Sequence, residues 1–179
     1  MSTADITPDI APDTDLDKPV ELAAIQAFLY REARLLDDEA WDEWVECYHP
    51  DVKFWMPCWD DDGKLITDPQ REISLIYYPS RQGLEDRVFR IKTERSSATM
   101  PDTRTSHNLS NVELLDVDGD TCTVRFNWHT LSHRYQTTYS YFGMSRYRLD
   151  LSGEQPRILD KYVVLKNDYI NQVIDIYHI

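Results

Sequence analysis

Two histidines in the second half of the chain have the spacing of a metal-binding pair. His129 and His133 are four residues apart, which on a helix would place both imidazoles on one face. The surrounding residues, NWHTLSHRYQTTYSY, are rich in Thr and aromatic side chains and favour a strand instead. On a strand, residues four apart are separated by about 13 Å, at about 3.3 Å per residue. Two imidazoles so far apart cannot bind one zinc ion at about 2 Å, so we expect an exposed or interface pair.

Three other polar groups deserve the same test. His107 follows a loop rich in Ser and Thr and is a candidate general base, but a hydrogen-bonded structural histidine is the commoner role. The run Asp60-Asp61-Asp62-Gly63 is similar to the start of a calcium loop, but the alternating ligands and late glutamate of an EF-hand do not fit its register. Glu85 and Asp86 are adjacent in a predicted helix and point in different directions. We therefore expect a solvated turn at residues 60–63 and ion pairs along the helix.

The sequence also lacks the motifs of common catalytic sites. No GxGxxG, GxxxxGK[ST], GxSxG or HExxH sequence occurs. The three cysteines, Cys47, Cys58 and Cys122, share no CxxC spacing, which favours reduced thiols over a metal site. We predict no catalytic residue, no bound cofactor and no metal site in this chain.

Cations gather between residues 73 and 111, although the whole chain has a net charge of -13. Such a cluster in an acidic protein indicates either a partner surface or an internal network of ion pairs. Arginine and tyrosine are enriched at protein interfaces, and arginine can form bidentate pairs with carboxylates. The interface candidates in this segment are Tyr77, Tyr78, Arg81, Arg90, Arg95 and Arg104.

Composition narrows the class of protein. With 179 residues, of which 41% are hydrophobic, the chain is long enough for one domain with a full core. A pI near 4.7 argues against nucleic acid as a partner, since phosphates need a basic surface. The sequence has neither a membrane-spanning apolar run nor a signal peptide, so we expect a cytoplasmic protein and no membrane contact. Residues 1–18, with five Asp, read as an acidic flexible arm, and residues 19–179 as a single domain.

Hydrophobic periodicity predicts helices first and strands later. One helix begins at Pro19, a second follows Asp38 and ends at His49-Pro50, and a third follows the cap Ser80. This order predicts an α+β fold, with the helices packed on one face of an antiparallel or mixed sheet. The predicted strands are residues 52–56, 73–77, 107–117, 121–135, 138–151 and 158–166.

The pattern from Tyr162 to Ile179 is apolar almost to the last residue of the chain. Chain ends ordinarily fray unless they are tied down. We therefore predict that this segment pairs as a strand at the sheet or packs at a subunit boundary, with Ile174 and Ile176 substantially buried. Ile176 and Tyr177 join the interface candidates.

Taken together, six long segments make the chain similar to a known family. It closely resembles the small (β) subunit of aromatic-ring-hydroxylating dioxygenases, in the benzoate/toluate 1,2-dioxygenase branch. The resemblance covers the chain from about residue 20 to its end. The segments are FLYREARLLDDEAWDEW (28–44), CYHPDVKFWMP (47–57), EISLIYYPSRQGLEDRVFRIKTERSSAT (72–99), DTRTSHNLSNVE (102–113), RFNWHTLSHRY (125–135) and VVLKNDYINQVIDIYHI (163–179).

The resemblance implies an NTF2-like cone, in which a strongly curved sheet wraps against helices. It also implies a structural, non-catalytic role in an α3β3 hexamer with large (α) subunits and other small subunits. The large subunit would carry a Rieske [2Fe–2S] cluster and a mononuclear Fe(II), and the complex would convert an aromatic carboxylate to a cis-diol with electrons from NADH. The alternative is a stand-alone NTF2-like isomerase or dehydratase, in which His107, His129 or Asp42 would converge inside the cone.

Overall fold

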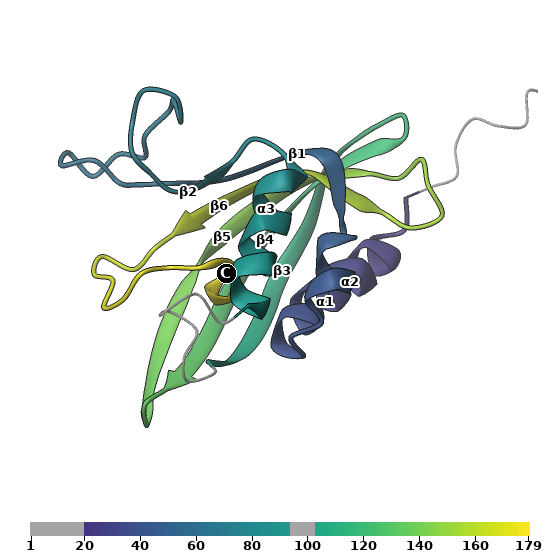
Figure 1. Cartoon of the computed structure of the whole chain (residues 1–179). Helices are drawn as coiled ribbons and strands as arrows, with labels where there is room; N and C mark the ends of the chain where they lie inside the picture. The colour runs from purple at the N-terminus through teal and green to yellow at the C-terminus, as the bar shows by residue number, and fades with distance from the viewer. Residues whose placement is uncertain (1–19, 94–102) are drawn as a thin grey trace, which may run out of the picture.

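The computed structural model of the chain describes residues 20–93 and 103–179 (Figure 1). The predicted arm at residues 1–18 and the interface candidate Arg95 lie outside the described residues. No helix in the described part of the chain is long and apolar enough to cross a membrane. The elements are α1 (Leu22–Asp37), α2 (Trp41–Val45), β1 (Tyr48–Pro57), β2 (Ser74–Tyr78), α3 (Arg81–Lys92), β3 (Arg104–Asp118), β4 (Thr121–Arg134), β5 (Thr137–Asp150), β6 (Arg157–Leu165) and the 3₁₀ helix η1 (Ile176–His178).

The six strands form one mixed sheet in the order β2-β1-β6-β5-β4-β3. Only the β1–β6 pair is parallel among these strands, and the other neighbours are antiparallel. Helix α1 packs against β3 and α3 packs against β1, so the helices cover one face of the curved sheet (Figure 1). This arrangement confirms the predicted α+β fold class and the position of the helices.

The core lies between the helices and the inner face of the sheet. In α1 the apolar residues Ile25, Phe28, Leu29 and Leu36 recur at helical spacing and are buried. In β4 alternate side chains from Cys122 to Ser132 are buried, as expected for a strand with one face on a core. The inner positions of β4 are apolar near its start and polar near its end.

The start of β1 differs from the prediction. Helix α2 ends at Val45, and His49 and Pro50 lie inside β1 instead of stopping a helix. Proline removes a donor from a ladder, so it is tolerated only where no hydrogen bond is needed. The pairing of β1 with β6 is irregular between Tyr48 and Lys53, and Pro50 falls in this gap.

The chain end also differs from the prediction of a strand. Residues after β6 form an irregular segment that ends in η1, and no described strand includes them. Ile174 and Ile176 are 8% and 0% exposed, which confirms their predicted burial. The Asp175 carboxylate caps η1 by accepting from the Ile176 amide, so a local turn satisfies the backbone where a strand ladder was expected.

Candidate partner surface and cone interior

Helix α3 carries most of the cations that the sequence singles out, and several of them form ion pairs within the chain. Arg81 Nε lies 2.9 Å from Glu85 Oε1, and Arg81 Nη2 lies 3.0 Å from Glu46 Oε1. Lys92 Nζ lies 2.8 Å from Asp42 Oδ2. These contacts fix α3 against α2 and the start of β1. For Arg81, the internal network that the sequence left as an alternative is therefore present.

Two interface candidates are exposed arginines. Arg90 lies on α3 beside Phe89, which is 61% exposed, and Arg104 begins β3. Within residues 20–93 and 103–179, neither arginine forms an ion pair. An exposed arginine beside an exposed aromatic ring has the composition of a partner-binding surface.

The two candidate tyrosines of β2 are half-buried. The hydroxyl of Tyr77 accepts a hydrogen bond of 3.2 Å from Gln70 Nε2. The ring of Tyr78 packs edge-on against Phe54, with 6.1 Å between centroids, and burial raises the pKa of the Tyr78 hydroxyl. Contacts within the chain therefore hold both tyrosines in place, and part of each side chain is still exposed and available to a partner.

The C-terminal candidates lie inside the chain. Ile176 is 0% and Tyr177 3% exposed, and both side chains belong to the core. Arg87 of α3 forms a bidentate ion pair with Asp175 next to them, with Nε 2.7 Å from Oδ1. This pair attaches the chain end to α3. A direct contact of Ile176 or Tyr177 with another subunit stays a prediction.

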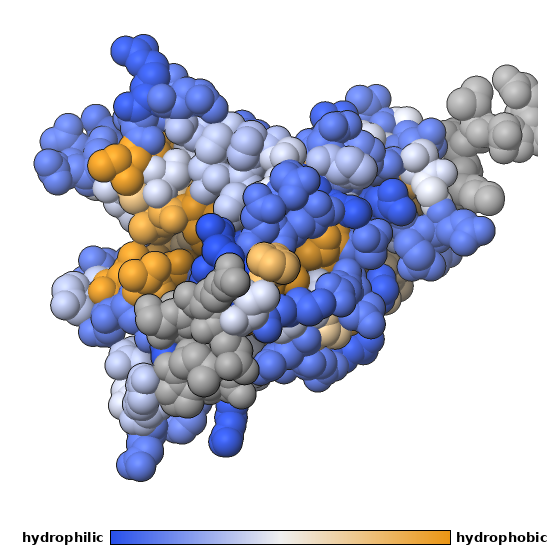
Figure 2. Space-filling view, viewed as in Figure 1, coloured by the Kyte–Doolittle hydropathy of each residue, from blue (hydrophilic) through white to orange (hydrophobic). Residues whose placement is uncertain are grey.

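Exposed apolar side chains gather at one place on the surface. Figure 2 shows apolar surface in a hollow between the segment that joins β1 to β2 and the segment that follows β6. Ile73, at the end of the first segment, is 82% exposed, and Val173, in the second, is 79% exposed. Trp59 Nε1 donates a 2.7 Å hydrogen bond to the Leu165 carbonyl and so links the first segment to the end of β6. Exposed apolar patches of this kind mark protein interaction sites.

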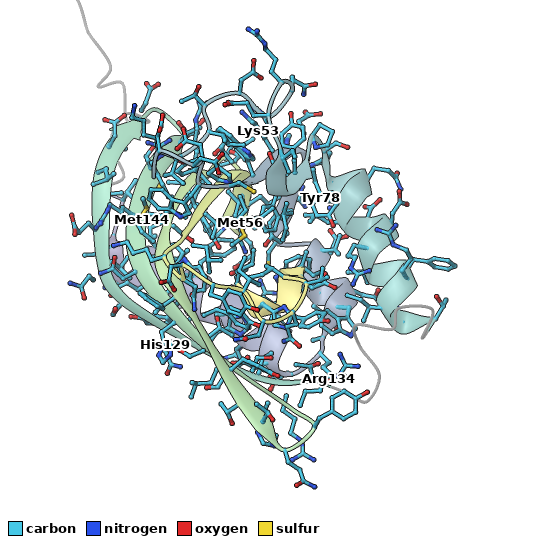
Figure 3. All side chains as sticks on the ribbon, turned by 90° about the vertical axis from the view of Figure 1, so that its left-hand side faces the viewer. Lys53, Met56, Tyr78, His129, Arg134 and Met144 are labelled. Carbon is cyan, nitrogen blue, oxygen red and sulfur yellow. The ribbon has the colours of Figure 1, made fainter. Side chains whose placement is uncertain are left out.

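The histidine pair lies on the opposite side of the sheet from the helices. His129 and His133 are exposed, as predicted, and Figure 3 shows His129 on the outer side of β4. Each ring makes a hydrogen bond to β5, with His129 Nε2 2.7 Å from Ser140 Oγ and His133 Nδ1 2.9 Å from Thr138 Oγ1. The pair therefore connects neighbouring strands.

His107 lies at the other face and forms a close pair with Asp37, the last residue of α1. His107 Nδ1 is 2.6 Å from Asp37 Oδ1, and the His107 amide donates to Asp37 Oδ2 at 2.9 Å. Both residues line a surface pocket of about 330 Å³ between α1 and β3. Asp42 is exposed and paired with Lys92, so His107, His129 and Asp42 do not converge as a stand-alone pocket enzyme would require.

The centre of the cone holds a buried ion pair that the sequence reasoning missed. Lys161 Nζ on β6 lies 3.1 Å from Glu32 Oε1 on α1, and the two residues are 1% and 3% exposed. The same carboxylate oxygen accepts from Trp44 Nε1 at 2.9 Å and from the Tyr48 hydroxyl at 2.6 Å. A signal was present, because Glu32 falls on the apolar stripe of α1 between Leu29 and Leu36.

Two further predictions concern metal ions. The run at residues 60–63 is a turn, as predicted, in which Asp60 Oδ1 accepts from the Asp62 and Lys64 amides at 3.0 and 2.7 Å. The described residues contain no group of three His, Cys, Asp or Glu side chains that could hold a metal ion.

Cys47 and Cys122 are buried free thiols, and burial raises their pKa values to about 12 and about 11.

Residues 31–172 match the family described as the ring hydroxylating beta subunit. The chain belongs to this family. It is 70% identical over 166 residues to benzoate 1,2-dioxygenase subunit beta of Acinetobacter baylyi (strain ATCC 33305 / BD413 / ADP1), covering 93% of this chain and 98% of that one. Toluate 1,2-dioxygenase subunit beta of Pseudomonas putida is 60% identical, covering 89% of this chain and 99% of the relative.

Solved structures agree with the family assignment. The crystal structure of the beta subunit of the benzoate 1,2-dioxygenase from Burkholderia mallei ATCC 23344 is 68% identical, with a TM-score of 0.78. It covers 91% of this chain and 100% of its own. An NTF2-like protein from Novosphingobium aromaticivorans has a TM-score of 0.57 at 14% identity, covering 82% of each chain, and shows the fold alone. This ring hydroxylating beta subunit therefore has the NTF2-like fold that the family resemblance implied.

Proposed function

We propose that this chain is the structural small subunit of a benzoate-type aromatic-ring 1,2-dioxygenase, and that a large subunit carries out the chemistry. The observation that carries the proposal is the 70% sequence identity, over nearly the full length of both chains, to a protein named benzoate 1,2-dioxygenase subunit beta. The site geometry supports it, because the candidate acid and base residues do not come together. His107 is paired with Asp37, Asp42 is paired with Lys92, and His129 is exposed on the outer face of the sheet. The exposed apolar hollow supplies the surface that a subunit needs for assembly.

The partner and the cofactors follow from this role. We infer an α3β3 hexamer in which each large subunit holds a Rieske [2Fe–2S] cluster and a mononuclear Fe(II), with electrons supplied by NADH through a reductase. The substrate is benzoate or a close aromatic carboxylate, and the product is a cis-diol carboxylate. The iron chemistry belongs to the partner, and this chain contributes binding surface and shape.

We propose that the apolar hollow with Ile73 and Val173, and the arginines Arg90 and Arg104, contact neighbouring subunits. The hollow supplies apolar area to be buried, and the arginines, elsewhere on the surface, supply donors for carboxylates of a partner. Tyr77 and Tyr78 add half-buried aromatic surface on β2. Arg81 contributes indirectly, since its ion pairs position α3.

Co-expression with the cognate large subunit, tagged for purification, tests the assembly role. We expect the wild-type chain to co-purify in equal molar amount, with a native mass that corresponds to three copies of each subunit. Ile73→Asp combined with Val173→Asp places two charges in the hollow and should reduce co-purification by about tenfold or more, equivalent to about 1.4 kcal/mol of binding free energy.

The matched control is Val117→Asp, which places one charge at a residue that is 47% exposed near the β3–β4 turn. The control should co-purify like the wild type, and all isolated variants should keep the wild-type melting temperature. A wild-type chain that stays separate from the large subunit would contradict the function. Normal co-purification of the doubly charged variant would contradict only the placement of the interface.

A further inference from the structure

The surface pocket of about 330 Å³ between α1 and β3 lies at one edge of the sheet, because β3 is an edge strand (Figure 1). Residues on one face of α1 line one wall, and consecutive residues of β3 line the other. These residues are Tyr30, Ala33, Arg34 and Asp37 on α1, and His107, Asn108 and Leu109 on β3. The volume falls in the range of about 300–1,000 Å³ that is typical of small-molecule sites. The polar groups in the wall therefore indicate which ligand the pocket fits.

The acceptors in this wall are already used within the chain. Asp37 Oδ1 accepts from Thr105 Oγ1 at 2.9 Å and lies 2.6 Å from His107 Nδ1, and Asp37 Oδ2 accepts from the His107 amide at 2.9 Å. Burial alone would raise the pKa of Asp37, but the hydrogen bonds from His107 hold it below its ordinary 3.8. The Nε2 atom of His107 is buried, and Asn108 Nδ2 donates to two backbone carbonyl groups. None of these side chains needs a ligand to complete its contacts on the pocket side.

The donors in the wall are free by comparison. In the part of the chain that the structure describes, the exposed Arg34 forms no ion pair, and neither its guanidinium nor the Tyr30 hydroxyl forms a hydrogen bond. The His107 amide points away from β4, toward Asp37. Amide directions alternate along an antiparallel strand, so the Leu109 amide, two residues on, points to the same free edge. A guanidinium, a hydroxyl and a backbone amide thus border one pocket.

Arg34 has a second possible role that the test must separate from binding. It lies in the last turn of α1, where a cation interacts favourably with the helix dipole. That role needs only a positive charge. It does not need a tyrosine one turn earlier on the helix or an unpaired amide on the facing strand.

We propose that this pocket binds a small carboxylate with a flat apolar body, for which benzoate is the probe. The two carboxylate oxygens would accept from the Arg34 guanidinium, the Tyr30 hydroxyl and the Leu109 amide. The apolar body would lie against the Tyr30 ring, Ala33 and Leu109. A cation does not fit the same place, because Arg34 would repel it and the oxygens of Asp37 are already used. The site goes beyond the proposed function, which places no ligand on the small subunit.

Titration of the full-length chain with benzoate, followed by the ¹H–¹⁵N signals of the backbone amides, tests the proposal. We expect the Leu109 signal to shift saturably, with a dissociation constant of about 1–10 mM for a ligand of this size. Benzamide has the same ring without the charge, so it should bind at least about fivefold more weakly. No saturable shift of the Leu109 signal, or equal binding of benzamide, would overturn the proposal.

Variants of Arg34 distinguish binding from the helix-dipole role. Arg34→Gln removes the charge and should weaken benzoate binding by about five- to tenfold. Arg34→Lys keeps the charge at the end of α1 but loses the planar fork of donors, so it should bind at least about threefold more weakly than the wild type. The control, Arg71→Gln, removes an exposed arginine near β2, at the other edge of the sheet, and should leave affinity unchanged. Wild-type affinity in either Arg34 variant, or an equal loss in Arg71→Gln, would overturn the proposal.

Discussion

Lys161 and Glu32 form an ion pair in the centre of the cone, with 3.1 Å between Nζ and Oε1. The Lys161 ammonium is surrounded by aromatic rings, the nearest being Phe54 at 4.9 Å and Tyr147 at 5.2 Å from Nζ to the centroid. Burial lowers the pKa of Lys161, and the charge of Glu32 opposes this change. With the hydrogen bond from Lys161 Nζ to the Tyr48 hydroxyl, the pair joins α1 to both β6 and β1.

Breaking this pair should be costly. Glu32→Gln leaves the Lys161 charge without its counter-ion, and we expect the free energy of unfolding to fall by about 3–5 kcal/mol. Replacing both residues, by Glu32→Leu and Lys161→Met, removes both charges and should cost less than Glu32→Gln alone. Urea denaturation of the three chains measures the difference. A double variant less stable than Glu32→Gln would contradict the unpaired Lys161 charge as the main cost, and would point to packing or to the buried donors of Trp44 and Tyr48 that lose their acceptor.

His178, the residue before the last, should make the free energy of unfolding depend on pH. Burial lowers the pKa of His178 from 6.5 to about 3, with His107, Arg134 and Arg87 as further causes. Because the folded pKa lies below the unfolded one, the contribution of His178 is complete above pH 6.5 and is lost as the pH falls toward 3. The loss should approach about 1.4 kcal/mol per pH unit within this window.

His178→Gln isolates this contribution. The difference in unfolding free energy between wild type and His178→Gln, measured from pH 7 to about pH 4, should shrink as the pH falls. The control His133→Gln changes an exposed histidine on the outer face and should give a difference nearly independent of pH. A constant difference for His178→Gln would contradict the buried, neutral imidazole.

Gly143 on β5 is required by the close approach of β6. A Cβ atom added there would lie 1.9 Å from the Val164 carbonyl oxygen and 3.0 Å from the Trp128 ring. Because the first of these atoms is backbone, Gly143→Ala must displace the strand pairing and should cost about 1–3 kcal/mol in unfolding free energy. Gly153→Ala, where the nearest atom is 3.6 Å away, is the control and should be nearly neutral in a thermal melt. Equal melting temperatures for the two variants would contradict this account of Gly143.

The ion pair of Arg87 and Asp175 should hold the chain end in place. Asp175→Asn removes the charge opposite a largely buried guanidinium and weakens the cap of η1, so we expect a loss of about 3–5 kcal/mol. Hydrogen exchange of the Tyr177 amide should accelerate more than that of the β4 amides. The control Asp168→Asn changes an exposed carboxylate and should have little effect. Unchanged protection of Tyr177 in Asp175→Asn would show that apolar burial alone holds this segment.

Periodicity in the sequence predicted most of the elements for a simple physical reason. The alternation in β4 and the helical stripe of α1 each reflect one buried face, which the residue types record directly. The segment after β6 misled the same reasoning, because Ile174, Ile176 and Ile179 are buried by an irregular turn that also leaves an apolar alternation. Pro50 misled it too, since the irregular pairing that tolerates a proline depends on a partner strand more than 100 residues away.

The candidate site was less predictable than the fold. Arginine and tyrosine in residues 73–111 suggested contacts with a partner. The local sequence did not indicate that Arg81 pairs with Glu46 or that Arg87 pairs with Asp175. These partners are 35 and 88 residues distant in the chain. The link between Asp37 and His107 spans 70 residues and likewise depends on the packing of α1 against β3.

Iron content and benzoate turnover, measured for the same preparation of this chain alone and with its large subunit, test the central claim most directly. We predict that the isolated chain has less than about 0.1 iron per chain, because a metal site needs three or four protein ligands. It should form no cis-diol from benzoate with the reductase and NADH. With the large subunit present, the complex should form the diol. Stoichiometric iron or diol formation in the isolated chain would contradict the claim that chemistry belongs to the partner.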